Sequence, residues 1–377
     1  MSARKSDALA GSKRLVVKIG SALLVNPGDG LIHRKWLASL ADDVAACRAR
    51  GQEVLIVSSG SIAVGLRHLG VAPDRSLRLE DKQAAAATGQ IRLAHAYQDA
   101  LARHDLTVAQ ILLTLHDTET RRQHINARNT IEALLRHGAV PVINENDTVA
   151  TDQIRVGDND RLAARVAAMV SADTLVLLSD IDGLHTEDPR RDSAATLIPE
   201  VREITPEIEA MAGAPTDRYS RGGMVTKIAA AKIAMGAGCR MAICNGGDEH
   251  PLAALAAGAP CTWFVPATTP LTARKRWIAG SLKPTGAVVV DDGAKRALHA
   301  NKSLLPAGVV AVEGKFDRGD LVVVRDGAGR EVGRGLMAYS ASEAGKIIGH
   351  KSDEIERLLG YRLREELIHR DDLVLTT

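Results

Sequence analysis

The chain has 377 residues, which is long for one domain and suits two domains that each bury a hydrophobic core. Its 48 basic and 46 acidic residues nearly balance, which argues against a strong nucleic-acid-binding protein. Aromatic residues make up only 2% of the chain, so a surface that stacks nucleic-acid bases is not expected.

The four cysteines show no C-x-x-C spacing, which argues against a zinc site or a disulfide framework. We therefore expect a protein of the reducing cytoplasm. The first 13 residues are polar and lack the apolar core of a secretory signal. The charge-free stretch 251–273 is long enough to cross a membrane, but prolines and a glycine interrupt it, so no membrane span is expected.

Short apolar runs alternate with helix-length amphipathic segments over the first 265 residues. The runs are Arg14–Ile19, Glu53–Val57, Thr107–Thr114, Ala139–Ile143, Thr174–Leu178, Arg240–Ile243 and Thr262–Val265. The helical segments include Arg34–Arg50, Asp81–His104 and Asp117–His137. Continuous apolar strands interleaved with helices predict an α/β fold with a mainly parallel sheet covered on both faces. Ligands then bind at the carboxyl ends of the strands.

The pattern changes between Pro266 and Pro284, where prolines stand among small and polar residues. Short strands with glycine-rich connections follow, which predicts a small mixed β domain. We therefore divide the chain into a flexible segment (1–13), an α/β domain (14–270), a linker (271–282) and a β domain with a C-terminal tail (283–377).

Residues 221–227 read Arg-Gly-Gly-Met-Val-Thr-Lys and lead into an alanine-rich helical stretch. The glycines let the backbone approach an anion, the helix start leaves amide groups unpaired, and Lys227 adds a positive charge. The segment therefore predicts a phosphate site, although a plain helix N-terminus with a solvated lysine would read the same way. The chain contains neither G-x-x-x-x-G-K-[ST] nor G-x-G-x-x-G.

Lys18 lies near the end of the first apolar run and is followed by Gly20 and Ser21. Burying an unpaired ammonium group costs several kcal/mol, as an order of magnitude. This lysine therefore either has a functional partner or lies on an edge strand from which it reaches water.

Carboxylate and amide side chains cluster in Asn144–Asp147 and Gly157–Asp160, on either side of an expected hairpin at 148–155. Turns and a helix cap account for some of them. Two lysines, glycine-rich turns and clustered aspartates suit phosphoryl transfer, whose transition state needs charge neutralisation and little covalent chemistry from the protein. A carboxylate acceptor is already ionised at neutral pH and needs no general base.

Five segments in this order resemble those of the glutamate 5-kinases, in the amino-acid kinase superfamily. They are residues 15–21, 57–63, 141–147, 157–160 and 222–227. The tail is similar to the PUA domain that many bacterial members carry, in segments 290–294, 303–308 and 314–320. Together the two resemblances cover nearly the whole chain beyond the first dozen residues.

The resemblance implies ATP-dependent phosphorylation of the γ-carboxylate of L-glutamate, the first step of proline biosynthesis, with Mg²⁺ and usually with feedback inhibition by proline. It implies that Lys18 and Lys227 neutralise the transferring phosphoryl group and that Asp160 positions them. Glutamate would be held by Ser59, Asp147 and Asn159. ATP would be contacted by Lys18, Ser179, Asp180, Arg221, Gly222, Gly223, Met224, Val225, Thr226 and Lys227. No side chain is assigned to a metal ion, and a homo-oligomer without membrane attachment is expected.

Two residues depart from the family pattern: Arg221 stands where threonine is frequent, and Ala22 where a second hydroxyl is frequent. The alternatives are a kinase of the same superfamily acting on acetylglutamate, aspartate, carbamate or UMP, or an RNA-binding regulatory protein. The small charge excess of the tail predicts no strong RNA binding. An acidic residue such as Asp147 suits a free α-ammonium group better than the amide of acetylglutamate.

Overall fold

A computed structural model describes residues 9–26, 28–72, 77–149, 159–213, 223–280 and 283–376. The chain forms two compact units, Met1–Pro270 and Leu271–Thr377. No helix in the described ranges is long and apolar enough to cross a membrane.

The first unit is built on an eight-stranded sheet in the order β3-β4-β2-β1-β5-β7-β8-β6. Its strands are β1 (Arg14–Ile19), β2 (Glu53–Val57), β3 (Val108–Leu113), β4 (Val140–Glu145), β5 (Thr174–Ser179), β6 (Glu200–Val201), β7 (Arg240–Asn245) and β8 (Cys261–Phe264). All neighbours are parallel except β7 and β8. The mainly parallel sheet predicted from the apolar runs is therefore confirmed.

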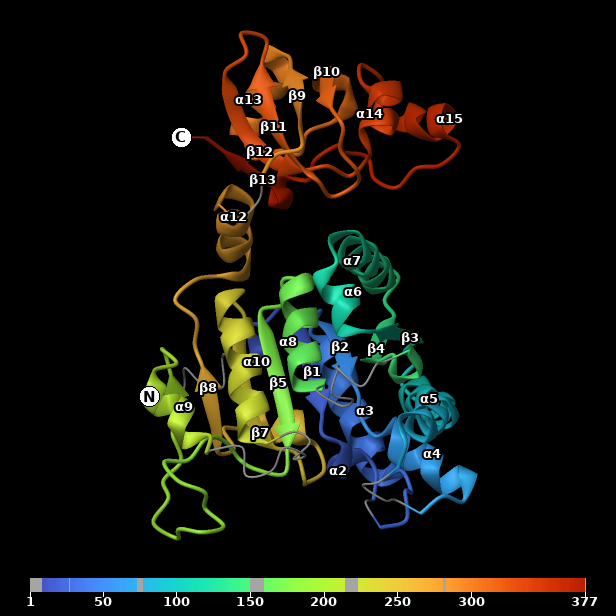
Figure 1. Ribbon diagram of the computed structural model, residues 1–377, viewed down its shortest axis with the longest axis vertical. Coiled ribbons are helices and arrows are strands. Elements are labelled where there is room, and N and C mark those ends of the chain that lie inside the picture. The colour runs from blue at the N-terminus through green and yellow to red at the C-terminus, as the bar shows by residue number, and fades with distance from the viewer. Residues whose placement is uncertain are drawn as a thin grey trace. The chain divides into compact units, whose positions relative to one another are not determined.

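Helices cover both faces of this sheet (Figure 1). They are α2 (Ser21–Leu24), α3 (Arg34–Ala49), α4 (Ser61–Leu69), α5 (Leu79–Ala102), α6 (Leu115–Glu119), α7 (Arg121–Arg136), α8 (Asn159–Met169), α9 (Pro206–Met211), α10 (Met224–Gly236) and α11 (Pro251–Ala256), with the 3₁₀ turn η1 (Asp147–Val149). Side chains alternate along β1: Val17 and Ile19 join the core that contains α3 and α5, whereas Val16 joins the core that contains α8 and α10. Lys18 shares the parity of Val16 and therefore faces α8 and α10.

The prediction of one helix at 117–137 is wrong, because this range includes residues of two separate helices, α6 and α7. The backbone of Thr120 is extended, with φ −72° and ψ 116°, and interrupts the helical hydrogen bonds. Of the segment expected as a hairpin at 148–155, residues 148 and 149 belong to the 3₁₀ turn η1. Residues 150–155 lie outside the described part of the chain.

The second unit holds a five-stranded mixed sheet in the order β10-β9-β11-β12-β13. Its elements are α12 (Pro270–Gly280), β9 (Gly286–Val290), α13 (Asp292–His299), η2 (Pro306–Gly308), β10 (Val309–Gly314), β11 (Leu321–Asp326), β12 (Glu331–Leu336), α14 (Ala341–Ile347), η3 (Ser352–Glu354), α15 (Ile355–Leu359), η4 (Arg370–Asp372) and β13 (Leu373–Leu375). Most of the range expected as a linker is helix α12. Its Ile278 is fully buried against Leu321 and Leu336, so this helix packs on the β unit.

Candidate active site

Two buried lysines meet one buried aspartate on the α8 and α10 side of the sheet. Lys18 Nζ lies 2.6 Å from Oδ1 of Asp160, and Lys227 Nζ lies 3.4 Å from Oδ2. The three side chains come from β1, α8 and α10, and α8 packs against both β1 and α10 (Figure 1). β1 is hydrogen-bonded on both sides, by β2 and β5, which rules out an edge-strand lysine at position 18.

Asp160 is ionised in this arrangement. Burial alone would raise the pKa of its carboxyl group, but the ammonium groups of Lys18 and Lys227 outweigh burial and lower it. Two ammonium groups surround one carboxylate at the carboxyl edge of a parallel sheet. The excess of positive charge makes this group a site that stabilises an anion.

The N-terminus of α10 carries the described part of the predicted phosphate segment. Gly223 has an extended backbone at the N-cap position, and the Thr226 hydroxyl lies 2.8 Å from both Asp160 Oδ2 and the Gly223 carbonyl oxygen. Met224 and Val225 open the helix, and the Val225 side chain is exposed. Arg221 and Gly222 lie outside the described residues, so their predicted nucleotide contacts stay predictions.

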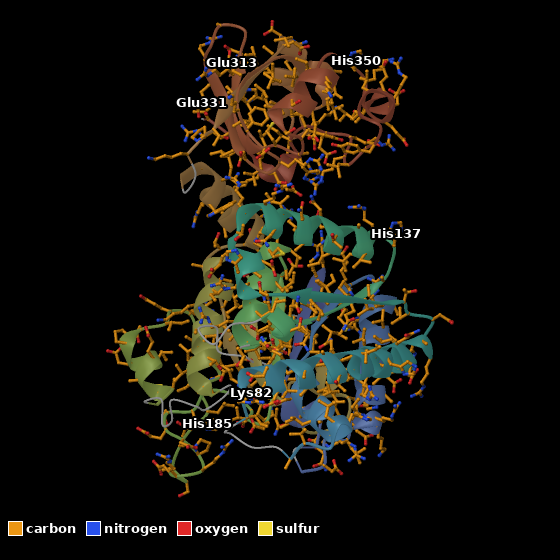
Figure 2. All side chains as sticks on the ribbon, turned by 45° about the vertical axis from the view of Figure 1, so that its right-hand side comes forward. Lys82, His137, His185, Glu313, Glu331 and His350 are labelled. Carbon is orange, nitrogen blue, oxygen red and sulfur yellow. The ribbon has the colours of Figure 1, made fainter. Side chains whose placement is uncertain are left out.

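Ser179 ends β5, directly beside the end of β1, because Ile19 pairs with Leu178. The Ser179 hydroxyl lies 3.1 Å from Oδ1 of Asp180, whose side chain is exposed. In the loop that follows, His185, labelled in Figure 2, bonds Asp182 through its Nε2 at 2.8 Å. The structure thus places Ser179 and Asp180 at the same sheet edge as Lys18.

Asn159 connects the lysine–aspartate group to a second polar cluster. Its Nδ2 donates to the Ser59 hydroxyl and to the Ser58 carbonyl oxygen, both at 2.8 Å. It also donates to Asn144 Oδ1 at 3.1 Å. Its own Oδ1 is buried and accepts no hydrogen bond from the described residues. A buried acceptor of this kind suits a ligand that donates a hydrogen bond.

Asp147 belongs to the same cluster through Ser61, the first residue of α4. The Ser61 hydroxyl donates to Asp147 Oδ2 at 3.3 Å, and both side chains are buried. The turn before α4 needs glycine, because Gly60 has φ +97° and a Cβ there would lie 2.8 Å from Val25 Cγ2.

Helices α4 and α5 cross at two glycines, Gly65 and Gly89. A Cβ on Gly65 would lie 1.7 Å from the Ala85 carbonyl oxygen, and one on Gly89 would lie 1.8 Å from the Ser61 carbonyl oxygen. Since atoms cannot approach this closely, only glycine allows the crossing. The crossing holds Ser61, and through it Asp147, against α5.

Sequence comparisons identify the two units. The profile of the amino acid kinase family matches residues 13–245, and that of the PUA domain matches residues 286–359. The chain belongs to the amino acid kinase family. It is 65% identical over 367 residues to a glutamate 5-kinase of Paramagnetospirillum magneticum, an alignment that covers 97% of this chain and 99% of the relative. It is 60% identical over 360 residues to a glutamate 5-kinase of Rhodospirillum rubrum, covering 96% of each chain.

Membership in the amino acid kinase family agrees with the resemblance that the five segments predicted. Of the predicted site residues, the structure brings Lys18, Asp160 and Lys227 into contact. It also brings Ser59 next to Asn159.

Proposed function

We propose that the chain transfers the γ-phosphoryl group of ATP to the γ-carboxylate of L-glutamate. The products are ADP and L-glutamyl 5-phosphate, and the reaction is the first step of proline biosynthesis. Glutamate 5-kinases related to the chain over 96% or more of its length support this function. The structural observation that carries the proposal is the contact of Lys18 and Lys227 with Asp160.

The lysines act on the charge that develops on the transferred phosphoryl group. In phosphoryl transfer the protein contributes mainly positioning and positive charge around the equatorial oxygens. Asp160 holds both ammonium groups close together, and the Thr226 hydroxyl bonds Asp160 from the start of α10. The acceptor carboxylate is ionised at neutral pH, so no general base is required.

The acceptor binds between Asn159 and Asp147 in this proposal. The Asp147 carboxylate and the buried Asn159 Oδ1 accept hydrogen bonds from the α-ammonium group of glutamate, and Ser59 lies beside them. An N-acylated acceptor has no such charge, which favours glutamate over acetylglutamate.

The nucleotide binds at the opposite side of the lysine pair. Ser179, Asp180 and the segment from Arg221 to Lys227 contact ATP, with the backbone of Gly223 next to the phosphates. Mg²⁺ is bound mainly by nucleotide phosphates and water in such enzymes. The ion would neutralise phosphate charge when bound.

The proposal also includes a cytoplasmic location, assembly into a homo-oligomer and inhibition by proline. It includes no strong binding of RNA by the PUA domain and no membrane attachment.

An acceptor screen tests the function. Purified protein is incubated with ATP, Mg²⁺ and hydroxylamine, which converts an acyl phosphate into a hydroxamate that is measured as its coloured Fe³⁺ complex. We expect hydroxamate with L-glutamate, and none with acetylglutamate or L-aspartate. Product from acetylglutamate at a rate comparable to that from glutamate would overturn the proposed acceptor.

A further inference from the structure

The second polar cluster extends beyond the predicted site residues to Gln90, a half-buried residue on α5. Asn144 Nδ2 donates to Gln90 Oε1 at 2.6 Å. Asn144 is itself almost fully buried, with 1% of its surface exposed, and the bond to Gln90 is partly buried. Asn144 in turn contacts Asn159, which places Gln90 three hydrogen bonds away from Ser59.

The direction of these hydrogen bonds is fixed by the backbone. The amide N–H of Glu145 can only donate, and it lies 2.9 Å from Asn144, so the atom of Asn144 that it meets must be oxygen. The other end of the Asn144 amide is therefore the NH₂ group, and it donates to Gln90. Gln90 must present its own oxygen to Asn144, so its Nε2 faces away from Asn144. Within the described ranges this Nε2 has no hydrogen-bond partner.

The same helix also borders Asp147. Gly89, the residue before Gln90, packs directly on the carbonyl oxygen of Ser61, and the Ser61 hydroxyl binds Asp147. The turn η1 that begins at Asp147 packs against α5. A fixed amide donor and a buried carboxylate therefore border one part of the cluster. The α-carboxylate and α-ammonium groups of an amino acid would match this pair.

We propose that Gln90 determines acceptor specificity by donating a hydrogen bond from Nε2 to the α-carboxylate of the amino-acid substrate. The inference rests on the proposed function and adds the recognition of the second charged group. A neutral donor suits this position, because a cation there would attract Asp147 and compete with the substrate's ammonium group.

The test combines a protein change with a substrate change. Gln90→Glu keeps an oxygen that accepts from Asn144 but replaces the donor by a second negative oxygen. L-glutamate 1-amide keeps the γ-carboxylate and the α-ammonium group but carries an amide in place of the α-carboxylate. Gln90→Met, similar in size without a donor, is the second variant. Gln98→Glu, an exposed position two turns along the same helix, is the matched control.

We expect Gln90→Glu to raise the KM for L-glutamate about 10- to 100-fold, the range for a lost hydrogen bond to a charged group. The KM for ATP should change less than about threefold. With L-glutamate 1-amide the variant should retain at least the wild-type kcat/KM, because the new carboxylate can accept from the substrate amide. Gln98→Glu should behave as wild type with both acceptors.

Equal loss of kcat/KM for the two acceptors in Gln90→Glu and in Gln90→Met would overturn the inference, because it would show that Gln90 acts only through Asn144. Calorimetric binding of both acceptors to the same proteins separates this outcome from failure of the proposed function. If the wild type binds L-glutamate without forming hydroxamate, the function is wrong, and the binding constants of the variants still decide the role of Gln90. No binding of L-glutamate to the wild type would overturn both.

Discussion

Replacing Lys227 by methionine tests whether this lysine serves the transition state. The change removes the charge and keeps most of the buried volume. At an effective dielectric constant of about 20, Asp160 loses about 5 kcal/mol of attraction at 3.4 Å and keeps about 6 kcal/mol from Lys18 at 2.6 Å. Asp160 also keeps the Thr226 hydroxyl. The protein should therefore stay folded.

The expected kinetic effect of Lys227→Met is a fall in kcat of about 100-fold or more, because one preorganised donor to the developing charge contributes about 3 kcal/mol. The KM values for ATP and L-glutamate should change only a few-fold, because the contact strengthens in the transition state. The assay is steady-state hydroxamate formation, with circular dichroism and thermal unfolding to check the fold.

Lys232→Met is the matched control, because Lys232 lies on the same helix with an exposed side chain that pairs with Glu209. It should keep wild-type kinetics. A folded Lys227→Met protein with kcat within about threefold of wild type would refute the reasoning. A rise confined to the KM for ATP would assign Lys227 to ground-state binding of the nucleotide instead.

Three further outcomes are expected. Asp147→Asn should raise the KM for L-glutamate at least tenfold, since a charge-assisted contact to the α-ammonium group is lost. The KM for ATP should change less than about threefold, and a change confined to the KM for ATP would contradict the assignment of Asp147 to the acceptor site. Burial would raise the pKa of Glu343, but hydrogen bonds from Arg318, Tyr361 and Ser340 lower it to about 2. The ionised Glu343 therefore contributes its full stabilisation above pH 4.5, and this stabilisation is lost as the pH falls toward 2. Arg318→Met should therefore destabilise the protein by about 1 kcal/mol at pH 7, and the difference from wild type in urea unfolding should vanish toward pH 2. A chain ending at Pro270, where the first unit ends, should be soluble and should phosphorylate glutamate; a folded but inactive fragment would show that the β unit is needed for catalysis.

The apolar runs predicted the sheet because parallel strands buried on both faces have a continuous apolar composition. All seven predicted runs begin and end within two residues of the observed strands, and the first two agree at both ends. The sequence did not predict α14, a helix of seven residues that Ser340 and Glu343 cap, because so short a helix has little periodicity to detect.

The lysines and the asparagine- and aspartate-rich segments of the site were visible in the sequence, whereas Gln90 and Ser61 were not. Lys18 is a charge in an apolar strand, and Lys227 follows two glycines, so both depart from their surroundings. Gln90 and Ser61 lie on helices where polar residues are common, and nothing in their local pattern separates them from solvent-exposed positions. Their roles depend on hydrogen bonds to Asn144 and Asp147, which come from other parts of the chain.

The close crossing of α4 and α5 limits how the acceptor specificity of this enzyme can be redesigned. Because Gly65 and Gly89 leave no room for even a methyl group, the spacing of the two helices cannot be tuned by small substitutions at the crossing. Libraries aimed at longer or shorter dicarboxylic acids should therefore keep both glycines fixed. They should instead randomise side chains that project from the ends of the helices, where the backbone can stay in place while the chemical groups offered to the substrate change.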